Sequence, residues 1–438
     1  MAMKIILFLS SILSFTLLVA QEDVTTYYKE NGKVKEQYEV IWEDTAVVHG
    51  DYHMYSPGGA LIIEGSYNKG LREGTFFNYY EDGTVQRETY YENGLKQGLT
   101  KVYAPNGQVV QEAIFKNDTL TGNLKLYDES GKLRGETEFS KGKPDGLVLS
   151  YFPDGTKAEE THYKNGKPNG YTRYYYENGN LKLEAEYING LLDGSYKTFF
   201  PSGQLEMEVL NLRGQRSGYV KYYHENGQLK SSGNYKEGAL QGEFVSFYDD
   251  GSPKAIYDYV DGKKSGKNIE YHQNGETKIA SSYSNNGLNA KIKEYSEKGD
   301  LISEISIVNE LPHGKWVYYD HKGRPAKVEE YENGKLHGLL QHYDNGTLMI
   351  KAEYAYGNQQ GHTEEYFPNG KLMISSEWKI GLLNGPYVRF YKNGHKEYEG
   401  NYLRNKRNGT WTFFDKKGEV TEVLQYRAGE ILNQSSSN

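Results

Sequence analysis

A repeat of 24 residues is the feature of this sequence that most constrains its fold. Sixteen copies align on an anchor position that is glycine in fifteen of them, from Gly50 to Gly409, with Ala290 as the exception and one residue missing after Gly338. Five residues after the anchor, every copy has Tyr or Phe. Self-similarity at a fixed period of this length is the signature of a repeat architecture, in which each unit packs on its neighbours.

Each repeat is predicted to form one β-hairpin. In one copy a strand runs from Gly170 to Tyr175, an Asn-Gly turn follows at residues 178–179, and a second strand covers residues 180–187. Asn-Gly turns are favoured because glycine adopts positive φ without strain and asparagine tolerates it. Positions 11, 15 and 17 after the anchor share parity and are mostly apolar, small and aromatic, so we expect them on the buried face. The predicted fold is an all-β, elongated array of about sixteen stacked antiparallel hairpins.

The ends of the chain differ from the repeats. Residues 1–20 carry one lysine, an apolar run from Ile5 to Val19 and then Ala20, which is the pattern of a cleaved secretory signal peptide. The alternative, a retained membrane anchor, needs about 20 apolar residues. Residues 21–49 contain the turn motif of the repeats, but its distance to Gly50 is three residues longer than the repeat requires. This segment is therefore predicted to cap the array. Repeats then occupy residues 50–433, and residues 434–438 form a polar tail. Because of the signal-peptide pattern, the protein is expected in the periplasm, the outer envelope or the extracellular medium.

Two repeats are irregular. Ala290 replaces the anchor glycine of the eleventh repeat. If it keeps the left-handed backbone of a glycine, the strain costs about 1 kcal/mol. In the thirteenth repeat the turn at residues 343–346 is one residue short. Both places are expected to interrupt the regular stacking.

The motif formed by Gly166, Gly170, Tyr175, Gly179 and Tyr187 resembles the MORN repeat, specifically its bacterial variant, over about residues 27–433. The resemblance implies β-hairpins stacked into an elongated sheet. Bacterial members of the family are often YwqK-type antitoxins, and eukaryotic relatives are associated with membrane attachment, phospholipid contact and scaffolding. An antitoxin-like inhibitor of a toxin partner and a phospholipid-associated scaffold are therefore alternative functions.

The sequence contains no motif for catalysis or for cofactor binding. A formal charge of −8 and an isoelectric point near 5.9 argue against a nucleic-acid partner, and the absence of cysteine excludes thiol chemistry. The eleven histidines lack metal-site spacing, so we predict no metal, no cofactor and no enzymatic activity. Glutamate recurs at position 14 in nine copies. We expect these carboxylates to pair with lysines on adjacent strands; the alternative is a ladder that binds calcium or a basic partner.

Tyrosine is the residue type best suited to binding in this chain, which has 42 of them. Many repeats carry a second aromatic residue beside the one at position 5, and rings on both sides of a strand cannot all enter one core. We predict an exported, non-enzymatic scaffold that binds a protein or cell-envelope component through a Tyr-rich sheet face, with membrane lipid as an alternative partner. The oligomeric state is not predicted. The candidate binding residues are Tyr80, Tyr174, Tyr176, Tyr222 and Tyr318.

Overall fold

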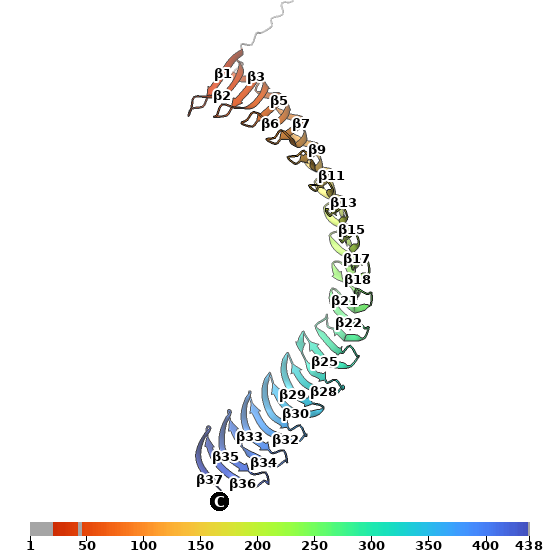
Figure 1. Ribbon diagram of the computed structural model, residues 1–438, viewed down its shortest axis with the longest axis vertical. Helices are drawn as coiled ribbons and strands as arrows, with labels where there is room; N and C mark the ends of the chain where they lie inside the picture. Colours follow the sequence, from red (N-terminus) through yellow and green to blue (C-terminus); the bar gives the residue numbers. More distant parts are fainter. Residues whose placement is uncertain (1–20, 43–45, 437–438) are drawn as a thin grey trace, which may run out of the picture. The chain divides into compact units, whose positions relative to one another are not determined.

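The computed structural model describes residues 21–42 and 46–436, which form β-strands joined by turns. The predicted signal peptide lies outside the described residues. Among the described residues there is no helix that could span a lipid bilayer. The chain divides into two compact units, Met1–Gly203 and Gln204–Asn438, and Figure 1 labels many of their strands. The predicted all-β repeat fold is confirmed.

The first unit contains fifteen strands. They are β1 (Gln21–Tyr27), β2 (Val34–Trp42), β3 (Ala46–Tyr55), β4 (Leu61–Asn68), β5 (Leu71–Tyr79), β6 (Val85–Glu92), β7 (Leu95–Tyr103), β8 (Val109–Lys116), β9 (Thr119–Tyr127), β10 (Leu133–Ser140), β11 (Lys143–Tyr151), β12 (Lys157–Lys164), β13 (Lys167–Tyr175), β14 (Leu181–Ile188) and β15 (Leu191–Phe199). Each strand pairs antiparallel with the next along the chain, so the unit is an open sheet.

The second unit contains the other 22 strands in the described part of the chain. They are β16 (Leu205–Leu212), β17 (Gln215–Tyr223), β18 (Leu229–Lys236), β19 (Ala239–Leu240), β20 (Gly242–Phe247), β21 (Pro253–Val260), β22 (Lys263–Tyr271), β23 (Thr277–Ser284), β24 (Asn289–Tyr295), β25 (Leu301–Val308), β26 (Leu311–Pro312), β27 (Gly314–Tyr319), β28 (Pro325–Glu332), β29 (Lys335–Asp344), β30 (Thr347–Ala355), β31 (Asn358–Tyr366), β32 (Leu372–Lys379), β33 (Leu382–Phe390), β34 (Lys396–Leu403), β35 (Lys406–Phe414), β36 (Val420–Arg427) and β37 (Glu430–Ser436). They pair antiparallel in chain order, with the short β19 and β26 sharing the neighbours of β20 and β27.

Most anchor glycines lie inside strands rather than at their starts, with Gly242 and Gly314 as exceptions, and the sequence did not predict this. On β12 and β13, Thr161 pairs with Thr172 and Tyr163 with Pro168, so three residues of β13 face one residue of β12. Gly170 lies in this bulge with φ of 114°. Glycine is favoured there because it adopts this backbone conformation without a Cβ penalty.

The eleventh repeat has no such bulge, and the predicted strain at Ala290 is wrong. β23 and β24 pair without a register shift from Ile279 opposite Glu294 to Ser284 opposite Asn289. The residues that form a bulge elsewhere lie here in a longer turn at residues 285–288. Asn285, Asn286 and Gly287 of that turn have φ of 49°, 53° and 81°, whereas Ala290 is not among the residues with positive φ. The left-handed conformation is therefore adopted by asparagine and glycine, which tolerate it, and not by Ala290.

The other irregularities are also absorbed at turns or hairpin ends. In the thirteenth repeat, Asp344 pairs with Thr347 across a two-residue Asn-Gly turn. Near the N-terminus, Trp42 pairs with Ala46 and extends the β2–β3 hairpin. At the other end, residues 434–436, predicted to be part of a polar tail, belong to β37.

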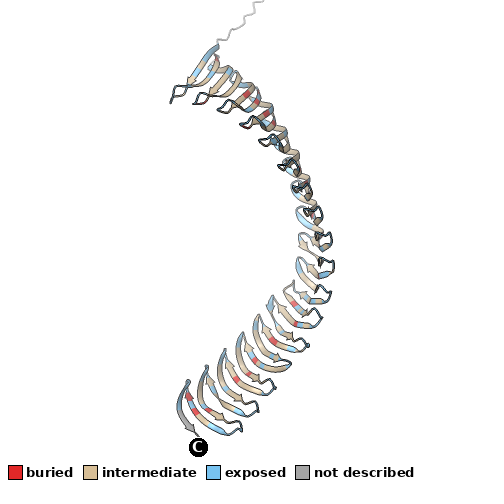
Figure 2. Cartoon of the chain, viewed as in Figure 1, coloured by how far each residue is buried: buried red, intermediate tan, exposed pale blue. Residues whose placement is uncertain are grey.

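The core is one layer of side chains on one face of the sheet, and Figure 2 shows buried residues as short segments on individual strands. Small residues at position 15, such as Ala185, are buried as predicted. The sequence did not predict their packing partner at position 2 of the next repeat. A Cβ on Gly65 would lie 2.5 Å from the ring of Phe76, and a Cβ on Gly400 would overlap the ring of the fully buried Trp411. A glycine at position 15 therefore makes room for a large side chain on the next hairpin.

Candidate binding face

The face opposite this core carries a ladder of charged side chains. Positions 3 and 14 pair across successive strands of the first unit. In chain order the ladder consists of Glu64, Phe77, Glu88, Lys101, Glu112, Lys125, Glu136, Leu149, Glu160, Arg173, Glu184 and Lys197. The predicted pairing of the recurring glutamates with basic residues is confirmed where Arg173 Nε lies 2.8 Å from Glu184 and where Lys125 Nζ lies 3.9 Å from Glu136.

The tyrosine at position 5 belongs to the same ladder. The Tyr79 hydroxyl donates a hydrogen bond of 2.6 Å to Glu64, fifteen residues earlier in the chain. The same bond, at 2.6 to 3.5 Å, recurs in other repeats. It joins Tyr103 to Glu88, Tyr127 to Glu112, Tyr175 to Glu160, Tyr223 to Glu208 and Tyr319 to Glu304. The recurring tyrosine and glutamate therefore tie consecutive repeats together.

These bonds predict that the fold is lost in alkali. Burial, together with the hydrogen bond to Glu64, raises the pKa of Tyr79 from 10.0 to about 12, and burial together with Glu364 does the same to Tyr366. A group whose pKa is raised by folding stabilises the fold fully below its unfolded pKa, near 10. This stabilisation declines as the pH rises from 10 towards 12. We expect circular dichroism and tyrosinate absorbance to change together in that range.

The matched control for the alkaline transition is Glu64→Gln. This variant removes the charge beside Tyr79 and leaves the other tyrosines as they are, so one tyrosine is expected to titrate earlier. Formation of tyrosinate at Tyr79 below pH 10 without loss of β-sheet signal would contradict the prediction.

Three of the five predicted binding residues occupy position 4, on the core side of the sheet. Tyr174 is the most exposed, at 40%. Burial and the nearby Glu159 raise its pKa. Tyr222 and Tyr318 are half-buried, and the ammonium group of Lys327 lies 5.7 Å from the centre of the Tyr318 ring.

The other two predicted residues occupy position 6, just after a strand ends. The hydroxyls of Tyr80 and Tyr176 each donate a hydrogen bond of 2.8 Å to a backbone carbonyl in the following repeat, those of Tyr103 and Phe199. The five tyrosines therefore do not form one patch: Tyr80 and Tyr176 bridge repeats through their hydroxyls, whereas position 4 lies on the core side.

Several exposed apolar side chains of the described repeats are at positions that the sequence analysis did not consider. On the ladder face of the first unit, positions 1 and 16 carry Tyr90 and Leu99, both 44% exposed, with Ile114 and Tyr171 also exposed. We call these four residues the apolar row. In the second unit, Tyr219 at position 1 is 71% exposed. Positions 1 and 16 alternate with the core positions along their strands and are therefore expected to face water. An apolar residue at either position was the sequence signal that could have identified the apolar row.

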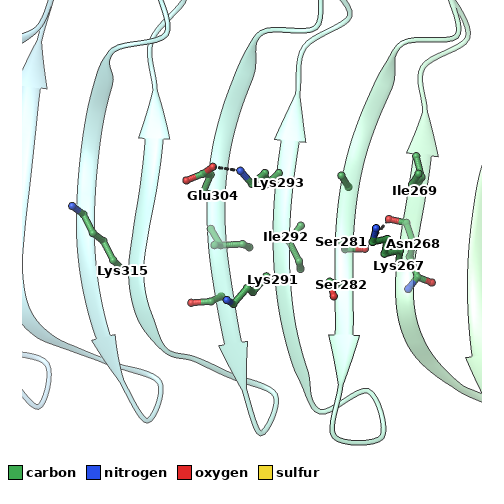
Figure 3. Close-up of a pocket in the computed structure, with 13 residues that line it drawn as sticks. Lys267, Asn268, Ile269, Ser281, Ser282, Lys291, Ile292, Lys293, Glu304 and Lys315 are labelled. Carbon is green, nitrogen blue, oxygen red and sulfur yellow. Dashed lines mark hydrogen bonds and ion pairs between the residues drawn. The ribbon is translucent and has the colours of Figure 1, made fainter.

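The second unit also contains a hollow of about 500 Å³ on its sheet (Figure 3). Strands β22 to β25 and β27 line it, and its side chains include Lys267, Ile269, Ala280, Lys291 and Lys315. Among residues 21–42 and 46–436, no three His, Asp or Glu side chains are grouped so that they could hold a metal ion. The hollow therefore combines positively charged side chains with apolar surface.

Comparison with known proteins identifies the repeat. The family model described as "MORN repeat variant" matches nine segments, which are residues 72–93, 96–117, 120–141, 144–165, 168–189, 192–210, 216–237, 359–379 and 383–403. No curated protein matched the sequence.

The solved structures that match include toxin-complex proteins. One is the crystal structure of TcdB2-TccC3, with 12% identity over 95% of this chain and 24% of the other, at a TM-score of 0.15. Another is the Tc holotoxin pore of Photorhabdus luminescens, with 12% identity, 91% and 24% coverage and a TM-score of 0.13. This chain spans about a quarter of their length. Because the TM-scores are so low, these matches support no conclusion about the function of this chain.

Proposed function

We propose that this chain, nine of whose repeats belong to the MORN repeat variant family, is a non-enzymatic, exported scaffold that binds a protein or cell-envelope component. The observation that carries the proposal is the apolar row of Tyr90, Leu99, Ile114 and Tyr171. These large side chains are exposed on a regular sheet face, and exposed apolar patches rimmed by polar residues mark interaction surfaces. The signal-peptide pattern of residues 1–20 supports the location.

The placement of these residues on β6, β7, β8 and β13 favours a partner that is itself extended. Leu99 and Ile114 are directly opposite each other on β7 and β8, and Tyr171 lies on β13 of the same unit. Several weak contacts on one rigid sheet add up to a strong interaction when the partner reaches all of them. The neighbouring charged ladder supplies a polar rim.

The experiment compares two tyrosines on opposite sides of one strand. Tyr171 and Tyr174 of β13 are 42% and 40% exposed, so replacing either by serine is expected to perturb folding equally. Capture of envelope material by the purified chain, quantified by mass spectrometry, is expected to fall about fivefold or more with Leu99→Ser and Tyr171→Ser together. Tyr174→Ser is expected to retain it. Loss with Tyr174→Ser alone would assign binding to the core side instead.

A further inference from the structure

Three lysines form a row across the hollow of the second unit. Lys267, Lys291 and Lys315 occupy position 1 of three successive repeats, on β22, β24 and β27, and all three are exposed. Between them lie serines, because Ser282 pairs with Lys267 and with Lys291, and Ser306 pairs with Lys291 on the other side (Figure 3). One strand lies between successive lysines, so two inter-strand spacings place them about 10 Å apart.

The positive charge of this row is not neutralised within the sheet. In the part of the chain that the structure describes, none of the three lysines forms an ion pair, and the nearby Lys293 pairs instead with Glu304 at 2.6 Å. In six other repeats position 16, which the two serines occupy here, carries a carboxylate. Those carboxylates are Glu138, Glu186, Asp258, Glu330, Glu353 and Glu377. Lys267 and Lys291 therefore lie opposite serines, whereas Lys315 lies opposite Glu330 on β28.

The floor beside the lysines is apolar. Ile269 and Ala280 pair with each other at positions 3 and 14, where several other repeats have a basic residue and a glutamate. The missing bulge of the eleventh repeat contributes to this arrangement, since the unshifted register places Lys291 opposite Ser282. The hollow thus combines regularly spaced ammonium groups with apolar contact surface.

We propose that this hollow, here called the lysine groove, binds an acidic segment of a partner polypeptide in the polyproline II conformation. That helix has three residues per turn and a rise of about 3.1 Å, so acidic residues at every third position recur on one side about every 9 Å. This spacing is close to that of the lysines. Apolar residues between the acids would contact Ile269 and Ala280, which favours a polypeptide over an inorganic polyphosphate. The groove uses none of the residues of the apolar row, so the inference goes beyond the proposed function.

The test measures binding of a labelled peptide of repeated Glu-Pro-Ala triplets to the purified chain by fluorescence anisotropy. We expect binding that weakens with added salt, because exposed charges are screened. Replacing Lys267, Lys291 and Lys315 by alanine is expected to reduce affinity about tenfold. The charge-matched control replaces three other exposed lysines by alanine and is expected to retain affinity. Those control lysines are Lys116, Lys164 and Lys236.

A second variant, Ser282→Glu, introduces the carboxylate that six other repeats carry at this position and places it between Lys267 and Lys291. It is expected to fold like the parent and to lose peptide binding to the same extent. Equal losses in the control triple variant would overturn the proposal in favour of unspecific electrostatics. Lysine-dependent binding of polyphosphate or of anionic vesicles that equals or exceeds peptide binding would overturn it in favour of another ligand, and absence of peptide binding would refute it.

Discussion

Replacing Gly400 by threonine is expected to destabilise the second unit by about 1–3 kcal/mol, and to stabilise it once Trp411 has also been replaced by threonine. In the native structure a Cβ at residue 400 would overlap the indole ring, so the first change overpacks a filled core. Trp411→Thr alone is expected to cost about 3–5 kcal/mol, because it leaves a cavity above Gly400. In that background the threonine at residue 400 fills part of the cavity.

This reversal of sign is measured by urea denaturation of the four proteins, followed by circular dichroism. The native pair of Thr161 and Thr172, both buried at the same two positions of other repeats, shows that the sheet accepts two threonines there. Additive effects of the two substitutions would contradict the packing relation.

Replacing Asn268 by leucine is expected to destabilise the same unit by about 3 kcal/mol. This side chain is buried at position 2 and makes three hydrogen bonds to the backbone. It accepts from the amide of Asp258 at 3.0 Å and donates to the carbonyls of Ser265 and Gly266 at 2.9 and 3.2 Å. Leucine of similar size would leave these groups buried without partners, and each such loss costs about 1–3 kcal/mol.

Thermal unfolding measures the loss, and hydrogen exchange identifies its cause. The Asp258 amide is expected to exchange faster in Asn268→Leu than in the parent. The control is Leu340→Val, which changes the size of an apolar side chain at the same position of another repeat and removes no hydrogen bond. Unchanged protection of Asp258 would show that the asparagine acts by packing alone.

The period and its glycines were enough to predict the fold, because each hairpin satisfies its own turn and strand preferences. The positions of the bulges were not readable, since Gly170 fits a turn, a strand start or a bulge equally well by residue type. Ala290 was misjudged for the same reason. We assigned a positive φ angle to residue 290, whereas the neighbouring turn of Asn285, Asn286 and Gly287 adopts the positive φ angles instead.

The binding candidates were chosen by residue type, and the structure distinguishes them by position. Tyr176 and Tyr171 are five residues apart in one hairpin, yet one hydroxyl is bound to a backbone carbonyl whereas the other side chain is exposed. Parity along the strand separates positions 1 and 16 from the core and was available from the sequence. The bond between Tyr79 and Glu64 was not, because it depends on the register between two hairpins.

The hydrogen bond from the Tyr176 hydroxyl to the Phe199 carbonyl affects how the number of repeats in the gene can change. The same bond joins Tyr80 to Tyr103, Tyr248 to Tyr271 and Tyr391 to Phe414. Because these four junctions use equivalent atoms, recombination that removes or duplicates whole periods between two of them reconnects a donor with an acceptor of the same kind. Small length errors survive only at turns, as in the shortened turn at residues 343–346. The copy number can therefore drift over generations while the joint between neighbouring modules stays the same.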